Sequence, residues 1–184
     1  MTTNDRQPLR IVLTGSESVG KTTLAADLAA HYGVLAVPEF VREFAQSIGR
    51  PIVYDDLITI ARSQVALEEA HLERARALRH TLLMHDTDPI STVVYAHHYF
   101  GGCPEEVEAL AISRIPDRYL LLDIDVPWVP DGVRDRGEKR TELQQLFEET
   151  LVRLGAPISR IHGSWSERRT RAIAEIDHLL SIRN

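Results

Sequence analysis

The chain has 184 residues, of which 43% are hydrophobic, so it can bury a sizeable core, and we expect residues 1–184 to form a single domain. Its 21 Lys and Arg residues against 27 Asp and Glu residues give a formal net charge of −6, which argues against a broad nucleic-acid-binding surface. The single cysteine, Cys103, excludes an internal disulfide, and no apolar run approaches the roughly 18 residues of a membrane span. The start of the chain does not resemble a signal peptide, so we expect a cytoplasmic protein, while its oligomeric state stays open.

Apolar runs alternate with helical patterns along the chain. The predicted strands are 9–14, 34–38, 81–85, 118–123 and 158–162. The predicted helices are 20–32, 40–48, 55–79, 88–99, 103–113, 140–154 and 166–182. Strands separated by helices are typical of a parallel sheet covered on both faces, so the predicted fold class is α/β.

Residues 15–22 read Gly-Ser-Glu-Ser-Val-Gly-Lys-Thr, a complete G-x-x-x-x-G-K-[ST] phosphate-binding loop between a predicted strand and a predicted helix. Gly15 and Gly20 allow the backbone to turn its N–H groups toward phosphate oxygens, and the helix dipole adds to that field. Lys21 is expected near the β- and γ-phosphates, and the hydroxyl of Thr22 on Mg²⁺. The expected cofactors are therefore ATP and Mg²⁺, with the nucleotide held by Gly15, Ser16, Glu17, Ser18, Val19, Gly20, Lys21, Thr22 and Thr23.

A second signal is the apolar run 82–85, which ends in Asp86. A P-loop enzyme needs an acid at the carboxyl end of a strand beside the loop, where it holds Mg²⁺ directly or through water. Asp123, at the end of another apolar run, competes for this role, but chain order favours Asp86 because the third strand of P-loop kinases usually lies next to the first. Asp88, ahead of Pro89, is the better helix N-cap candidate and is also a candidate substrate contact.

Glu39 closes the short apolar stretch 34–38 and is followed by Arg42. Because the carboxyl ends of parallel strands face the ligand crevice, we expect Glu39, Asp86 and the phosphate loop to meet in one cleft. Either carboxylate could accept the proton of an attacking hydroxyl, and Arg42 could steady a phosphate or orient the acid. An ordinary surface pair between Glu39 and Arg42 at a helix start is the alternative.

Residues 126–140 contain two prolines, two glycines and four cations, which makes the segment a poor helix interior and a candidate lid. Arg134 and Arg140 are the candidates to stabilise the transferred phosphoryl group, although a solvated basic loop would look the same. Farther along, Gly163 and Ser164 follow the last predicted strand, and similarity to P-loop kinases, in which the comparable loop lies on the adenine side, implies the same place for them. The spacing of Ser164 and Glu167 predicts a capping box that starts the last helix near Trp165.

The predicted helix 55–79 carries two polar residues, Gln64 and His71, on its apolar face. A polar group there needs a partner, so Gln64 is either a substrate contact or a structurally satisfied amide. His71 is more often a core or rim histidine than a ligand. No spacing of His, Cys or Asp resembles a zinc site.

These residues together resemble the ribosylnicotinamide kinase domain of NadR-type proteins and the related AAA_28 group of P-loop ATPases and kinases. The likeness rests on the phosphate loop together with the segments 39–42, 55–64, 86–92, 99–101 and 128–134. It implies a P-loop NTPase fold of three α/β/α layers, with a five-stranded parallel sheet in the order 2-3-1-4-5 and a lid. It also implies ATP-dependent phosphorylation of the 5′-hydroxyl of nicotinamide riboside or a similar small-molecule nucleoside.

One departure from the resembled pattern is Pro38, which stands where the family often has an aromatic residue before the acid. Recognition of a flat base would then fall to Tyr54, Tyr95, Tyr99 or Trp128. Two alternatives stay open: a kinase for another nucleoside or for a nucleic-acid 5′-hydroxyl end, and a nucleotide-binding switch module that hydrolyses ATP slowly.

Overall fold

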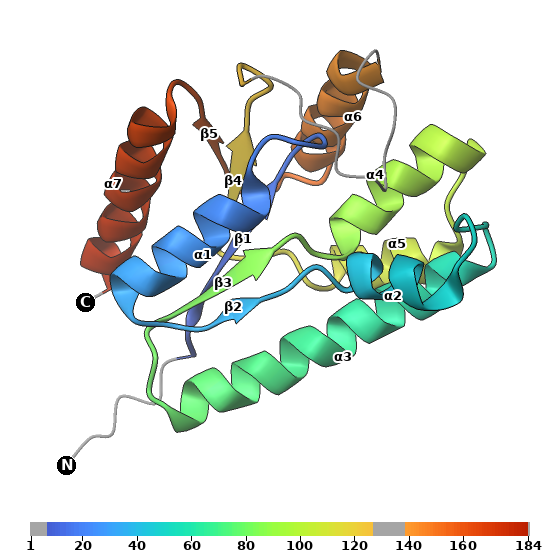
Figure 1. The fold of residues 1–184 in the computed structure, drawn as a ribbon. Coiled ribbons are helices and arrows are strands. Elements are labelled where there is room, and N and C mark those ends of the chain that lie inside the picture. The colour runs from blue at the N-terminus through green and yellow to red at the C-terminus, as the bar shows by residue number, and fades with distance from the viewer. Residues whose placement is uncertain (1–6, 127–138, 184) are drawn as a thin grey trace.

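The computed structural model describes residues 7–126 and 139–183, in which five strands form one parallel sheet (Figure 1). The strands follow each other in space in the order β2-β3-β1-β4-β5. The predicted α/β class and the predicted strand order are therefore confirmed. The strands are β1 (Leu9–Thr14), β2 (Ala36–Val37), β3 (Leu82–Asp86), β4 (Arg118–Leu122) and β5 (Ile158–Ile161).

Helices cover both faces of this sheet and make it the middle of three layers (Figure 1). The helices are α1 (Lys21–Tyr32), α2 (Phe40–Ile48), α3 (Asp56–Ala77), α4 (Pro89–Phe100), α5 (Glu105–Ile112), α6 (Arg140–Arg153) and α7 (Trp165–Arg183). α1 and α7 pack on one face, whereas α3, α4, α5 and α6 pack on the other. The predicted elements match these within a few residues.

Side-chain alternation along the strands explains the two cores. In β1, Ile11 and Leu13 belong to the cluster under α1 and α7, and Val12 belongs to the opposite cluster. All three are at most 2% exposed, as expected for a central parallel strand buried on both faces. Among the helices of the described ranges, none combines the length and the hydropathy required to cross a bilayer.

The second strand is shorter than predicted. Only Ala36 and Val37 pair with β3, although residues 34–38 were expected to be extended. Pro38 follows directly and has no N–H to donate to a ladder, so the edge strand stops there and the chain turns into α2.

Two predicted helix starts are confirmed in detail. The Asp88 carboxylate accepts a hydrogen bond from the Ile90 amide at 3.1 Å and caps α4, which has Pro89 in its first turn. At α7, the Ser164 N–H donates a hydrogen bond to the Glu167 carboxylate at 2.8 Å, and the Glu167 N–H donates a hydrogen bond to the Ser164 hydroxyl at 3.4 Å. This reciprocal pair is the capping box predicted from the sequence.

Candidate active site

The phosphate loop connects β1 to α1 and is built on left-handed backbone. Gly15, Ser18 and Gly20 have φ values of 126°, 54° and 88°. A Cβ on Gly15 would lie 2.7 Å from the carbonyl oxygen of Leu122, so a side chain at this position would collide with β4. The loop therefore keeps the close backbone turn that a phosphate cradle needs.

Lys21 lies over this loop. Its buried ammonium donates to the carbonyl oxygens of Gly15 and Ser16 at 3.0 and 2.7 Å. The next two residues, Thr22 and Thr23, are exposed in the first turn of α1. The ammonium and the positive end of α1 thus converge on one small region, as a polyphosphate site requires.

Two long-range side chains brace the loop. Oε1 of Gln144, in α6, accepts a hydrogen bond from the Ser16 N–H at 2.9 Å. Nε2 of the same side chain donates a hydrogen bond to the Leu122 carbonyl oxygen at 3.0 Å. Arg168 of α7 is fully buried and donates to the carbonyls of Val19, Asp123 and Gly163 at 2.8, 2.7 and 3.0 Å, and to the Asp125 carboxylate. These contacts tie the loop to the ends of β4 and β5.

The predicted adenine-side residues lie close to the phosphate loop. The Gly163 amide donates to the Asp125 carboxylate, and the indole of Trp165, two residues later, lies beside Gly20. A Cβ on Gly20 would lie 3.0 Å from Cζ3 of this indole, which leaves only glycine unhindered there. The start of α7 therefore forms one border of the loop.

Asp86 ends β3 beside the phosphate loop, because β3 pairs with β1 in the register Leu13 to Asp86. The prediction that the third strand lies next to the first is therefore confirmed. The Thr22 side chain hydrogen bonds to Asp86, and burial raises the pKa of this carboxyl above its usual range. The Oδ1 atom of Asp86 is buried and has no hydrogen-bond partner among the described residues. A hydroxyl and an unsatisfied carboxylate oxygen are the hard ligands that Mg²⁺ prefers, so Thr22 and Asp86 fit this metal.

Glu39 lies at the end of β2, at the N-cap of α2. Its side chain is 3% exposed and forms an ion pair with Arg42, with Oε2 2.8 Å from Nε. Repulsion between the Glu39 and Asp86 carboxylates also helps to raise the pKa of Asp86. The two carboxylates thus share one edge of the sheet, as the sequence predicted.

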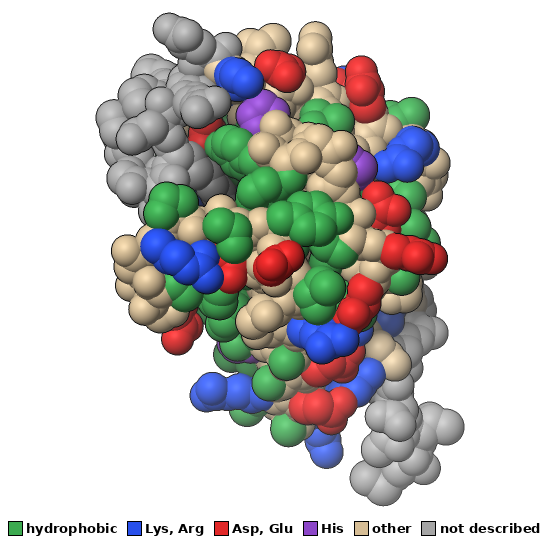
Figure 2. All heavy atoms as spheres, turned by 90° about the vertical axis from the view of Figure 1, so that its right-hand side faces the viewer, with side chains coloured by type: hydrophobic (Ala, Val, Ile, Leu, Met, Phe, Trp, Pro, Cys, Tyr) green, Lys and Arg blue, Asp and Glu red, His purple; other side chains and the backbone are tan. Residues whose placement is uncertain are grey.

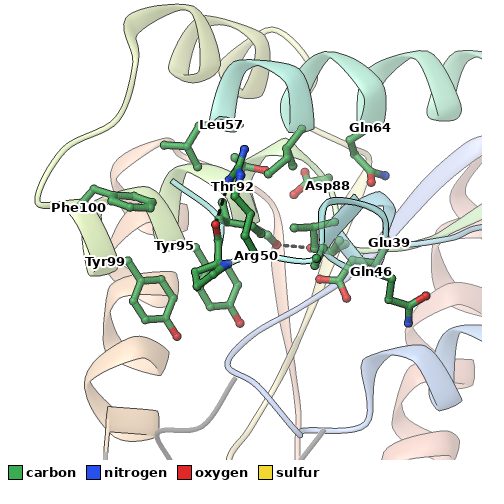
Figure 3. A pocket seen from close by; sticks show the side chains of 18 residues that line it. Glu39, Gln46, Arg50, Leu57, Gln64, Asp88, Thr92, Tyr95, Tyr99 and Phe100 are labelled. Carbon is green, nitrogen blue, oxygen red and sulfur yellow. Dashed lines mark hydrogen bonds between the residues drawn. The ribbon is translucent and has the colours of Figure 1, made fainter. Parts of the chain in front are cut away.

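A cavity of about 810 Å³ opens beside these carboxylates, between α2, α3 and α4 (Figure 3). Glu39, Asp88 and Gln64 lie at one end in this view, and Tyr95, Tyr99 and Phe100 at the other. The lining residues are Glu39, Val41, Ala45, Gln46, Gly49, Arg50, Pro51, Ile52, Leu57, Ile60, Gln64, Thr87, Asp88, Ser91, Thr92, Tyr95, Tyr99 and Phe100. The side of the molecule near the ends of α2 and α4 shows hydrophobic side chains gathered among scattered charges (Figure 2).

The aromatic end of the cavity is ordered by ring contacts. Tyr95 and Tyr99 stack with centroids 6.0 Å apart and planes 7° from parallel, and Phe147 meets Tyr95 edge-on at 5.8 Å. Tyr54 is not part of the lining and packs edge-on against Phe100 at 5.9 Å. Such flat, partly exposed faces can receive another planar ring.

The remaining predicted residues fall into three groups. Asp88 lines the cavity, but its carboxylate already accepts hydrogen bonds from the Ile90 amide and from the Tyr119 hydroxyl, and burial raises its pKa to about 6.

Arg140 is the first residue of α6 and donates hydrogen bonds to the carbonyl oxygens of Val126 and Ser18 at 2.7 and 3.3 Å, on the side of the phosphate loop. Burial lowers the pKa of this guanidinium. Trp128, Arg134 and most of the predicted lid lie outside the described residues.

Several residues of the site were missed from the sequence. Arg50 lines the cavity and forms a two-pronged ion pair with Asp56 at 2.7 and 2.9 Å, which holds the pKa of Asp56 at about 2. Thr87, between Asp86 and Asp88, has φ of 76°, an uncommon conformation for a β-branched residue. Strained backbone of this kind clusters at functional sites.

A family model described as an AAA domain, AAA_28, matches residues 10–168 of this chain. The chain therefore belongs to the AAA_28 family. The match includes the phosphate loop, both carboxylates and Arg168, so the whole site just described lies within the family region.

Curated relatives and solved structures agree with this placement. The trifunctional NAD biosynthesis/regulator protein NadR of Escherichia coli is 29% identical over 147 residues, which are 77% of this chain and 35% of that protein. A NadR protein solved with NAD and AMP-PNP and another with NR both superpose with a TM-score of 0.77, at 20% and 22% identity. They cover 95% of this chain and 50% and 52% of theirs. Deoxyadenosine kinase from M. mycoides superposes with a TM-score of 0.62 over 92% of this chain and 100% of that one, at 10% identity.

This AAA_28 chain thus has the fold of P-loop nucleoside kinases. It spans about a third of the length of the curated relatives that it matches.

Proposed function

We propose that the protein is an ATP-dependent kinase that transfers the γ-phosphoryl group to the 5′-hydroxyl of nicotinamide riboside. The observation that carries this proposal is the shared edge of the sheet: the phosphate loop follows β1, and the cavity opens beside the ends of β2 and β3. A donor bound by the loop and an acceptor bound in the cavity would meet at this edge. Similarity to NadR, including a NadR structure bound to NR, supports the choice of acceptor.

On the donor side, we propose that Lys21 and the loop amides hold the phosphates, with the adenine near Gly163 and Ser164. Thr22 and Asp86 would hold Mg²⁺, which when bound neutralises charge on the phosphate oxygens. Arg140, next to the Ser18 carbonyl, and Arg134 would add positive charge at the transferring group.

On the acceptor side, we assign the base to Glu39 and the metal to Asp86. Glu39 lines the cavity, whereas Asp86 does not and is hydrogen bonded by Thr22. A general base must reach the hydroxyl that it deprotonates, so the carboxylate facing the cavity is the better candidate. Arg42, whose Nε lies 2.8 Å from Oε2 of Glu39, would orient this carboxylate.

The planar base would lie at the other end of the cavity. Tyr95 and Tyr99 offer stacked faces there, which supports recognition of a flat ring despite Pro38. Tyr54, packed on Phe100, would border the entrance, and Trp128 remains a candidate contact.

The test is a panel of nucleosides incubated with γ-labelled ATP and Mg²⁺. We expect labelled product on nicotinamide riboside, and none on a nucleic-acid 5′-hydroxyl end. Label on a different nucleoside would show that the protein is a kinase with another acceptor. Release of free phosphate alone, with every acceptor, would instead support a nucleotide-hydrolysing switch module.

A further inference from the structure

Gln64 lies in α3 and is 3% exposed, and its amide contacts the two peptide groups on either side of Glu39. Oε1 accepts the N–H of Phe40 at 2.9 Å. Nε2 lies 3.4 Å from the carbonyl oxygen of Pro38, to which it donates. One side chain from a distant helix therefore brackets the backbone that carries the candidate base.

These contacts change how α2 begins. The first N–H groups of a helix have no partner within the helix, and a short polar side chain at the N-cap commonly folds back to satisfy one of them. Glu39 occupies the N-cap of α2 but makes no such side-chain bond. Gln64 satisfies the first helical amide, that of Phe40, from outside. The Glu39 carboxylate thereby lines the cavity beside Arg42 instead of capping its own helix.

The orientation of the Gln64 amide is fixed by its surroundings. Its Nε2 also lies 3.5 Å from Oε1 of Glu68, one turn along α3, and Glu68 is held by Arg114 at 3.1 Å. The NH₂ group thus faces two oxygen acceptors, and the carbonyl oxygen faces an N–H donor. Rotation of this amide by half a turn would put like groups together at each contact.

We propose that Gln64 is a positioning residue that holds the Glu39 carboxylate at the acceptor hydroxyl. The amide acts through the backbone of residues 38–40 and does not itself take part in the chemistry. This inference rests on the proposed function, because it gives Gln64 a role through the candidate base of that reaction.

The chain offers a matched control on the donor side. Gln144 is also buried and also joins an amide to a carbonyl, but it braces Ser16 of the phosphate loop. Gln64→Met and Gln144→Met remove the same chemistry from the two halves of the site. Gln145, the exposed neighbour on α6, gives a third variant, Gln145→Met, for which no effect is expected.

Steady-state kinetics should separate these variants. For Gln64→Met we expect kcat to fall about 10- to 100-fold, with the KM for MgATP within about twofold of wild type. For Gln144→Met we expect the KM for MgATP to rise. The proposal is overturned if kcat of Gln64→Met stays within about twofold of wild type while the protein is folded. It is also overturned if Gln64→Met changes the KM for MgATP as Gln144→Met does.

A second variant removes the same hydrogen bond from the other side. Phe40 is the first residue of α2, a position where proline is well tolerated, and Phe40→Pro deletes its N–H while leaving Gln64 in place. Phe40→Ala is the control for the lost ring. If the bond carries the effect, the double variant Gln64→Met/Phe40→Pro loses no more kcat than the worse single variant. Fully additive losses would contradict the proposal.

A spectroscopic measurement keeps the inference separate from the proposed function. The carboxyl ¹³C resonance of Glu39, assigned by its absence in Glu39→Gln, should move in Gln64→Met and stay unchanged in Gln145→Met at a fixed pH. An unmoved resonance in Gln64→Met overturns the positioning role whether or not a nucleoside is phosphorylated. If the resonance moves in Gln64→Met but the wild-type protein phosphorylates no acceptor, only the kinase proposal is refuted.

Discussion

The guanidinium of Arg168 donates a hydrogen bond to the carbonyl oxygen of Val19, 149 residues earlier in the chain. The same side chain reaches the carbonyls of Asp123 and Gly163. One buried cation therefore fixes the loop, the end of β4 and the start of α7, which border the proposed nucleotide site, relative to one another.

We therefore predict that Arg168→Lys weakens nucleotide binding. A single ammonium cannot span the acceptors that a planar guanidinium reaches, so buried carbonyls lose their donors. The KM for MgATP should rise about 10-fold or more, with a smaller change in the KM for the acceptor. Arg169→Lys, one residue along and partly exposed, is the matched control. Equal effects on both KM values would show that Arg168 serves general stability only.

Asp86→Asn tests the metal assignment. The amide keeps the size of the side chain but removes the charge next to Thr22, so turnover should fall about 100-fold or more at saturating Mg²⁺. Stability without nucleotide should not fall, because burial already disfavours the charged carboxylate. Asp123→Asn, which changes the competing acid at the end of β4, should retain turnover. The assignment is wrong if Asp86→Asn retains turnover and Asp123→Asn loses it.

Tyr99→Ala tests the location of the planar base. Loss of the ring that stacks on Tyr95 should raise the KM for nicotinamide riboside about fivefold, because an aromatic contact of this kind contributes roughly 1 kcal/mol. Tyr99→Phe retains the flat face and should behave almost as wild type. The KM for MgATP should stay constant in both variants. An unchanged acceptor KM in Tyr99→Ala would place the base elsewhere.

Glu68→Gln tests the buried acid below the cavity. Glu68 is 2% exposed and faces Arg114, Gln64, His85 and Asp88, and burial raises its pKa from 4.5 to about 7. Because the folded pKa is raised, the stability contribution of Glu68 is complete below pH 4.5 and is lost as the pH rises to about 7.

The variant lacks this titration, so its stability relative to wild type should increase between about pH 5 and pH 8, by at most about 3 kcal/mol. Urea denaturation at both pH values measures the difference. Glu69→Gln, on the half-exposed partner of Arg114, is the control and should show a smaller trend. A relative stability of Glu68→Gln that falls with pH would contradict the raised pKa.

Much of the fold and part of the site could be predicted because their signals are local. The phosphate loop is continuous in sequence, and Asp86 and Asp88 follow an apolar strand directly. Most partners of Gln64, Gln144 and Arg168 could not be predicted, because they are backbone carbonyls and amides that leave no residue pattern. The pairing of Arg50 with Asp56 and the positive φ of Thr87 likewise depend on how α3 and α4 pack.

The most direct test of the proposed kinase is ³¹P NMR of the protein with Mg²⁺, ATP and nicotinamide riboside. We predict that the γ-phosphate signal declines while a phosphomonoester signal grows, and that Lys21→Ala abolishes this change while remaining folded. Growth of inorganic phosphate alone, or an equal phosphomonoester signal with Lys21→Ala, would contradict transfer from a nucleotide held by this loop.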